Sequence, residues 1–146
     1  MKFTNCHILT ICYHTALKLF TQEVFILDSL YRIYDMLSDK NRLRILKLLE
    51  YKPMCVCELT YVLGIRQPSV SRHLRKLKET GLIDSRQEGL WSEYYIDNSG
   101  DEYSRILMNI LRGWINNDPV VVEDIKKATQ SCREVLCTNQ KNTNPV

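Results

Sequence analysis

The chain has 146 residues, of which 45% are hydrophobic and 25% charged, with few glycines and prolines. These values are ordinary for a globular protein and exclude a low-complexity or repetitive chain. The formal net charge of +3 is unevenly distributed, because residues 40–86 hold eleven Lys or Arg and four Asp or Glu, a local charge of +7, and the remainder carries −4. A basic segment of this kind predicts a nucleic-acid partner.

The first 20 residues are mostly apolar and include an early lysine, Lys2, as in an export signal. His7, His14 and Lys18 interrupt the run, no cleavage site between small residues follows, and the run is too short to span a bilayer. We therefore expect a cytoplasmic protein with no membrane partner. In a reducing compartment its six cysteines are thiols that bind ligands or sense oxidants. Residues 1–22 are assigned to an N-terminal arm or extension, in which Cys6 and Cys12 are metal-competent.

Two helices are expected before Pro53. Residues 23–37 place apolar side chains at helical spacing, which gives a continuous apolar side suited to a dimer interface. Ser38 or Asp39 is expected to cap a second helix that ends before Pro53. In this second helix Arg42, Arg44 and Lys47 are expected to face outward. The core positions are Leu43, Ile45, Leu46, Leu48 and Leu49.

Residues 54–95 predict a winged helix-turn-helix. Gly64 suits the end of a short helix, Gln67 an N-cap, and Pro68 the first position of the next helix. Val70, Leu74 and Leu77 then form a buried stripe. Residues with DNA-contacting side chains are expected on the remaining surface, together with the cap residue. They are Gln67, Ser69, Ser71, Arg72, His73, Arg75 and Lys76.

A β-hairpin is expected after this helix and forms the wing. Residues 82–86 alternate as a strand, the chain turns at Gly89, and residues 91–96 return. Arg86 and Gln87 are placed near the tip, where they can reach phosphate or the minor groove. The fold class is therefore mainly α with a small β-hairpin.

Residues 23–117 are assigned to the DNA-binding and dimerisation domain, because a further apolar helix follows the wing. This helix starts at Ser99 or Asp101 and carries Tyr103, Ile106, Leu107, Ile110, Leu111 and Trp114, which are expected to complete a dimer interface. Residues 118–146 are assigned to a C-terminal helix over 120–136 and a polar tail. No phosphate loop, CxxC or HExxH is present, and no enzyme activity is expected.

Cys55 and Cys57 lie just after Pro53, in the expected first turn of the short helix. Residues two apart in a helix point about 200° away from each other, so one ion cannot hold both thiols while the turn is intact. Binding of both would unwind the turn and tilt the helix that supports residues 68–78. Two alternatives remain open: both are small buried side chains, or one of them forms a disulfide in a redox sensor.

The segments CVCEL and QPSVSRHLRKLKETGLIDSRQEGLWSEYY resemble the ArsR/SmtB family of metalloregulatory repressors, and most closely its arsenic-sensing branch. The resemblance covers residues 30–115. It implies a homodimer that represses an operon until a thiophilic ion releases it from double-stranded operator DNA. The implied effector is As(III) or Sb(III), bound by Cys55 and Cys57.

The family pattern also marks two departures. The arsenic branch commonly carries a third cysteine where this chain has Thr60. Cys6 and Cys12 of the arm can replace it, as in a related branch that senses Cd(II) or Pb(II), and Cys132 and Cys137 are a second candidate pair. Binding by Cys55 and Cys57 alone is the third alternative. A family zinc site would require metal-binding side chains at positions matched here by Asp101, Tyr103, Trp114 and Asn117. Only the aspartate is suitable, so no zinc site is expected there.

Overall fold

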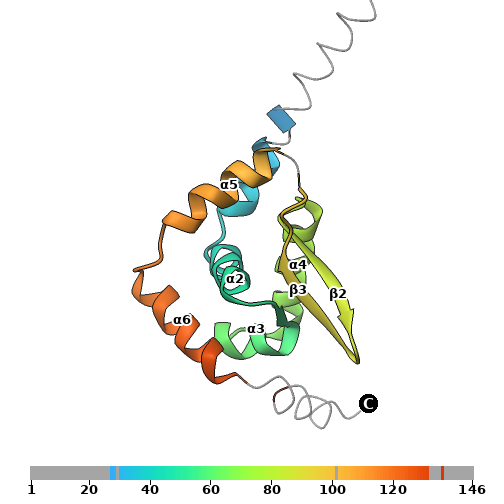
Figure 1. The fold of residues 1–146 in the computed structure, drawn as a ribbon, viewed down its shortest axis with the longest axis vertical. Coiled ribbons are helices and arrows are strands. Elements are labelled where there is room, and N and C mark those ends of the chain that lie inside the picture. Colours follow the sequence, from blue (N-terminus) through green and yellow to red (C-terminus); the bar gives the residue numbers. More distant parts are fainter. Residues whose placement is uncertain (1–26, 29, 101, 132–135, 137–146) are drawn as a thin grey trace, which may run out of the picture. The chain divides into compact units, whose positions relative to one another are not determined.

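The computed structural model describes residues 27–28, 30–100, 102–131 and 136. It divides the chain into two units, Met1–Tyr34 and Asp35–Val146. Figure 1 shows a mainly helical second unit with a small sheet. Its elements are α2 (Lys40–Tyr51), β1 (Met54–Cys55), α3 (Val56–Leu63), α4 (Gln67–Glu79), β2 (Ile83–Glu88), β3 (Trp91–Ile96), α5 (Glu102–Gly113) and α6 (Pro119–Gln130). The winged helix-turn-helix predicted from the sequence is confirmed.

The helix expected over residues 23–37 is present at residues 27–28 and 30–37, and residues 23–26 lie outside the described part. Leu27, Tyr31 and Tyr34 expose their side chains within the first unit. None of the helices that the structure describes is long and apolar enough to cross a membrane.

Helix α2 begins where its cap was expected. The Asp39 carboxylate accepts hydrogen bonds from the backbone N–H groups of Asn41, at 2.8 Å, and Arg42, at 3.3 Å. The N–H groups of a first turn lack the usual partner four residues earlier, and among the described residues the Arg42 N–H otherwise bonds only the Asp39 carbonyl, so the cap stabilises this turn. Lys52 is the extended C-cap residue, and the helix ends before Pro53 as expected.

The expectation that the basic side chains of α2 face outward is wrong for Arg42 and Lys47, both of which are buried. Arg42 donates to the backbone carbonyls of Met36 and Asp35, at the end of the preceding helical residues. Lys47 bonds Glu50 and the carbonyl of Leu111. Carbonyls at helix ends lack intrahelical donors, and cationic side chains satisfy them.

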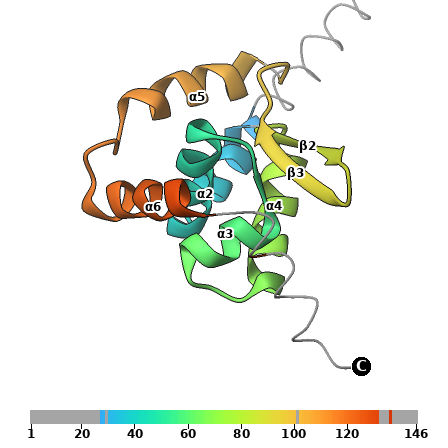
Figure 2. The same cartoon turned by 60° about the horizontal axis from the view of Figure 1, so that its bottom comes forward.

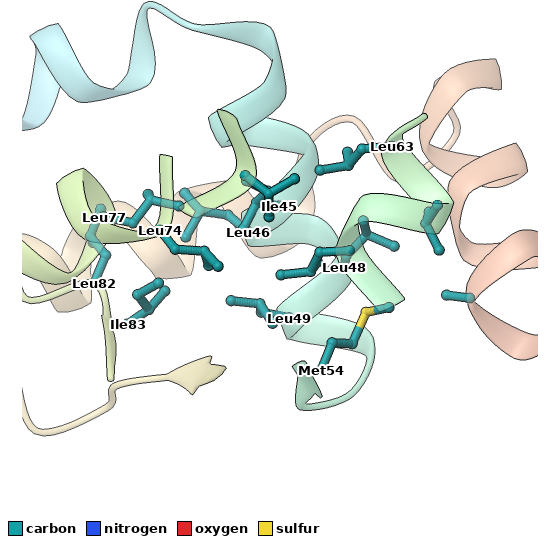
Figure 3. Close-up of a cluster of buried hydrophobic side chains, with 14 of the residues drawn as sticks. Ile45, Leu46, Leu48, Leu49, Met54, Leu63, Leu74, Leu77, Leu82 and Ile83 are labelled. Carbon is teal, nitrogen blue, oxygen red and sulfur yellow. The ribbon is translucent and has the colours of Figure 1, made fainter. Parts of the chain in front are cut away.

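The helix-turn-helix is built around one apolar cluster, shown in Figure 3. Gly64 ends α3 with φ +66°, in the left-handed region that favours glycine. Helix α4 starts one residue earlier than expected, with Arg66 rather than Gln67 as N-cap and Pro68 in the first turn. Leu74 and Leu77 of α4 point into the same cluster as Leu48 of α2. This packing fixes α4 against α2 and α3.

The sheet has three strands rather than the two of a hairpin. Its order is β1-β3-β2, and both pairs are antiparallel. β2 and β3 form the expected wing with Gly89 at its turn (φ +58°), but β1 adds a short edge strand in which Cys55 lies opposite Glu93. The cysteine segment is therefore hydrogen-bonded to the wing.

Helix α6 packs beside α2 and α3, as Figure 2 shows. Its buried Asp124 receives two hydrogen bonds from the Arg44 guanidinium, at 2.6 and 2.7 Å. The expectation that this helix runs unbroken to residue 136 is wrong, because Ser131 is an extended C-cap residue with ψ 123°. Helix α6 therefore ends at Gln130.

Candidate DNA interface and thiol site

The solvent-facing side of α4 carries most of the residues predicted to contact DNA. Val70, Leu74 and Leu77 are fully buried, as the stripe predicted, and hold the opposite side against the core. Ser69 is half-buried at the N-terminal turn. The exposed members of the predicted set on this helix are Gln67, Ser71, Arg72, Arg75 and Lys76. Helix α4 thus presents hydroxyl, amide, guanidinium and ammonium donors on one solvent-facing surface.

His73 does not lie on that surface, so the expectation that it is exposed is wrong. Only 7% of the residue is accessible, and its Nδ1 lies 3.8 Å from the Asp39 carboxylate. Burial lowers the pKa of His73, an effect that Asp39 opposes and that Arg42, Arg72 and Lys76 reinforce. The signal was present in the sequence, because position 73 lies three residues after Val70 and belongs to the same helical stripe.

The wing residues Arg86 and Gln87 are exposed but already have partners. Arg86 donates two hydrogen bonds to Glu93 Oε2, at 2.9 and 2.6 Å, and its guanidinium lies 5.6 Å from the centre of the Tyr95 ring. Gln87 donates from Nε2 to the Gly89 carbonyl. Gln87 therefore supports the turn of the wing, and Arg86 supports the pairing of β2 with β3. The Arg86 side chain nevertheless remains exposed to solvent.

Cys55 and Cys57 differ in their surroundings. Cys55 is buried, with 2% of its surface accessible, and is the extended N-cap of α3 (φ −86°, ψ 167°). Cys57 is half-buried in the first turn, and neither cysteine is in a disulfide within the described residues. The expectation that both lie in the helical turn is wrong for Cys55. Its place in β1 follows from the pairing with Glu93 in β3.

The cap of α3 is held by Glu58, a residue that the sequence analysis missed. Its buried carboxylate accepts from the Cys55 N–H at 2.9 Å and from Lys52 Nζ at 3.0 Å. Burial opposes ionisation of Glu58, but the hydrogen bonds from Cys55 and Lys52 outweigh it and lower the pKa. The spacing from residue 55 to Glu58 is that of a capping box, with Cys in place of Ser or Thr, and this signal could have found it.

The end of α6 reaches the same carboxylate. Ser131 Oγ lies 3.4 Å from Glu58 Oε1 and 3.3 Å from Lys52 Nζ. Within the described residues, no group of three or more His, Cys, Asp or Glu is placed to hold a metal ion. Cys6, Cys12, Cys132 and Cys137 lie outside those residues. The described part of the chain therefore supplies two thiols of a possible site and the helix cap that separates them.

Comparison with known proteins identifies the family. Residues 39–85 match the model described as "Bacterial regulatory protein, arsR family". An uncharacterized HTH-type transcriptional regulator of Methanocaldococcus jannaschii is 46% identical over 65 residues, which are 44% of this chain and 73% of that protein. The chain belongs to the arsR family. Membership of this family makes the protein a DNA-binding transcriptional regulator and not an enzyme.

Two further relatives of this arsR-family chain carry functional names. The arsenical resistance operon repressor of Escherichia coli K12 is 42% identical over 64 residues, 43% of this chain and 55% of that protein. The cadmium resistance transcriptional regulatory protein of Lactococcus lactis is 35% identical over 66 residues, 44% of this chain and 56% of that protein.

A solved structure confirms the fold of this arsR-family regulator. The homodimeric winged helix-turn-helix domain of a possible ArsR-family regulator from Mycobacterium bovis aligns with a TM-score of 0.55 at 26% identity. The alignment covers 66% of this chain and 87% of that domain.

Proposed function

We propose that this protein is a metal(loid)-responsive repressor that binds operator DNA as a homodimer. It is released when a thiophilic ion, As(III) or Sb(III), binds Cys55 and Cys57. The observation that carries the proposal is the position of Cys55, a buried cysteine that caps the helix packed against α4. A soft ligand pair at the start of the supporting helix is suited to a thiophilic ion and to transmitting its binding.

The release mechanism follows from the cap. Cys55 and Cys57 belong to different backbone conformations, so holding both sulfurs on one ion requires the turn between them to rearrange. Such a change breaks the bond from the Cys55 N–H to Glu58 and disturbs the β1–β3 pairing. Helix α3 packs on α4 through buried residues including Leu59 and Val62, and a shift of α3 therefore reorients α4.

A third thiolate is needed for a tight three-coordinate site. We propose testing Cys132 first, because it follows Ser131, whose side chain lies beside the Glu58 carboxylate, and adjacent Cα atoms are about 3.8 Å apart. Cys137 belongs to the same candidate pair. Cys6 and Cys12 of the arm are the competing pair, and a four-thiolate set from the arm would favour Cd(II) or Pb(II). The relatives named for arsenic and for cadmium support both effector classes.

The homodimer is proposed from the apolar surface of α5. Ile106 and Ile110 of α5, and Trp114 just after its end, are 50, 44 and 64% exposed and follow each other at intervals of four residues. A contiguous exposed apolar surface of this kind is typical of a protein interface. The homodimeric solved relative supports the same assembly.

The test is a fluorescence-anisotropy titration of reduced protein on DNA from its own promoter at fixed salt. Arsenite, antimonite, cadmium, lead and zinc are added separately, with peroxide as a further arm. We expect release by arsenite or antimonite, lost in Cys55→Ser and in Cys57→Ser. The variants Cys132→Ser, Cys137→Ser, Cys6→Ser and Cys12→Ser then identify the third ligand by loss of effector affinity.

A thiol redox or sulfur-species sensor of the same fold is the second candidate function, favoured by two cysteines, Cys55 and Cys57, that form no disulfide within the described residues. Release by peroxide alone, reversed by a reductant, would establish this alternative. Release by no agent would contradict both effector mechanisms, while binding to the promoter would still support the DNA-reading assignment.

A further inference from the structure

A pocket of about 340 Å³ lies between the C-terminal half of α4 and the sheet. Leu74 and Tyr94 contribute its apolar wall. The polar lining comes from both elements: Ser71, Arg75, Lys78 and Glu79 from α4, and Ser85 from β2. The pocket is therefore apolar on one side, and the other side is lined by hydrogen-bond donors and the Glu79 carboxylate.

The donors are brought together by the periods of the two elements. Ser71, Arg75 and Lys78 follow each other at four and three residues along α4, so they lie on one face of the helix. Ser85 and Tyr94 are directly opposite each other in the β2–β3 ladder, so their side chains share one face of the sheet. All three α4 residues are exposed, and a ligand that enters the pocket can reach them.

In the DNA-free protein, each of the two cationic side chains of this pocket is paired with a carboxylate. Lys78 Nζ lies 2.8 Å from Asp84 Oδ1 and donates to Ser85 Oγ at 2.8 Å. The pair is half-exposed, and their hydrogen bond raises the pKa of Lys78 and lowers that of Asp84. Arg75 lies 4.0 Å from Glu79 on the same helix. Both contacts are exposed ion pairs, a class that other anions can displace because each contributes little.

We infer that this pocket seats one backbone phosphate of the operator and that Asp84 holds Lys78 until the phosphate displaces it. The inference rests on the proposed function, because it takes α4 as the helix that enters the major groove. A helix in the major groove and a wing reaching the adjacent minor groove must straddle one sugar-phosphate backbone, and this pocket lies between these two elements. Hydroxyl and cationic donors suit the phosphate, and the apolar wall suits the deoxyribose.

The first test measures operator affinity against salt concentration for Lys78→Met and Asp84→Asn without effector. Each phosphate neutralised by a protein cation contributes about 0.9 to the slope of log K against log salt. Lys78→Met should therefore lower the slope by about 0.9 per protomer, on operator and on unrelated DNA alike. Asp84→Asn should bind more tightly, by up to roughly fivefold per protomer, because Lys78 no longer has a competing carboxylate.

The matched controls are Lys127→Met and Glu123→Gln. These two residues form an exposed lysine–carboxylate pair on α6, with atoms 3.9 Å apart, and neither lines the pocket. We expect both controls to retain the wild-type slope. Thermal melts of all four variants show whether each is folded. A folded Lys78→Met variant with the wild-type slope, or weaker binding by Asp84→Asn, would overturn the inference.

A second test locates the phosphate on the DNA. Replacing single operator phosphates with neutral methylphosphonates should weaken wild-type binding at one position per half-site where it leaves Lys78→Met unaffected. The absence of such a position would contradict the inference. Saturation of the Ser71 and Ser85 amide shifts by submillimolar inorganic phosphate would assign the pocket to a free anion and also overturn it. Failure of the wild type to bind any promoter DNA would instead refute the proposed function.

Discussion

His73 is buried where α4 meets the cap of α2, and its titration should be visible in the stability of the protein. Its pKa is below 6.5 in the folded state, chiefly because of burial. The unfolded chain therefore takes up a proton first as the pH falls, and the free energy of unfolding decreases below about pH 6.5. The lowered pKa values of Asp39 and Glu58 act in the same direction, but only in more acidic solution.

We predict that the melting temperature of the wild type falls more between pH 7 and pH 5.5 than that of His73→Gln. The glutamine is a polar side chain without a titrating group in this range. The measurement is thermal unfolding followed by circular dichroism at constant ionic strength. Parallel pH dependence of the two proteins would show that His73 does not carry the effect.

Arg72 is exposed at the middle of the α4 surface, and no ion pair ties its side chain within the described residues. If it forks onto a guanine, Arg72→Ala should weaken operator binding by about 1–3 kcal/mol and leave unrelated DNA much less affected. The neighbouring Lys76→Ala is a matched control that should weaken both DNAs about equally. An anisotropy titration of each variant on both DNAs decides this, and equal losses for Arg72→Ala would remove it from base recognition.

Arg42 and Lys47, which the sequence analysis placed on the outside of α2, were misplaced for one physical cause. Helical spacing shows which positions face the same way, and it located Val70, Leu74 and Leu77 correctly. It carries no information on which carbonyl or carboxylate another segment brings to a position. Arg42 is buried because it meets the carbonyls of Asp35 and Met36, a contact set by how the chain turns before α2.

At the scale of elements, the cap of α3 is where stability and effector binding should oppose each other. Glu58→Gln keeps the shape of the side chain but removes the charge that Lys52 and the Cys55 N–H contact. We expect it to lower the free energy of unfolding by about 1–3 kcal/mol, because the amide keeps only one acceptor oxygen for the two donors and Lys52 loses its counter-charge. It should also tighten arsenite binding, roughly tenfold for each 1.4 kcal/mol of cap energy that binding must overcome.

Urea unfolding and calorimetric titration with arsenite provide the two readouts for Glu58→Gln. Glu123→Gln, an exposed carboxylate on α6, is the control and should change neither. A destabilised Glu58→Gln variant with unchanged arsenite affinity would show that binding leaves the cap intact, which would contradict the release mechanism.

Helix α6 is attached to α2 by the pair of Arg44 and Asp124. Asp124→Ala leaves a half-buried guanidinium without its partner and should lower the free energy of unfolding by about 3 kcal/mol. Glu123→Ala, which breaks the exposed pair with Lys127, should change it by about 0–1 kcal/mol. Urea unfolding measures both. Similar values for the two variants would show that the Arg44 pair does not hold α6.

The elements predicted best are those with strong periodicity or a clear cap, including α4 and the two strands of the wing. Those missed have neither signal. Strand β1 has two residues, too few to show alternation, and exists because β3 offers Met54 and Cys55 a free edge. Helix α6 ends before Ser131, although no glycine or proline marks this position in the sequence. The geometry of the thiol site depends on strand β1 and on the end of α6. Residue spacing alone therefore placed Cys55 in the first helical turn instead of in the extended strand before it.

At the scale of the whole molecule, the proposed repressor requires two copies of α4 held at a fixed separation. Half-sites on one face of B-DNA are about 34 Å apart, and a monomer can contact only one of them. The solvent-facing apolar side of α5 is the described surface best suited to hold two copies together. Ile110 lies on this surface and is absent from the core cluster, so its replacement should leave the fold intact.

We predict that Ile110→Lys is a folded monomer in which the salt dependence of DNA binding falls to about half, because the number of phosphates contacted is halved. Val122→Lys is the matched control, because Val122 is a similarly exposed apolar residue on α6, and this variant should remain dimeric. Light scattering after size-exclusion chromatography reports the mass, and anisotropy titrations report the slope.

The Ile110→Lys variant also tests which chain supplies the third thiol ligand. Cys55 and Cys57 belong to one chain, so the arsenite affinity of the monomer answers this question. Retained affinity would place the third ligand within the same chain, and its loss would place that ligand on the partner copy. A dimeric Ile110→Lys variant would show that α5 is not the interface.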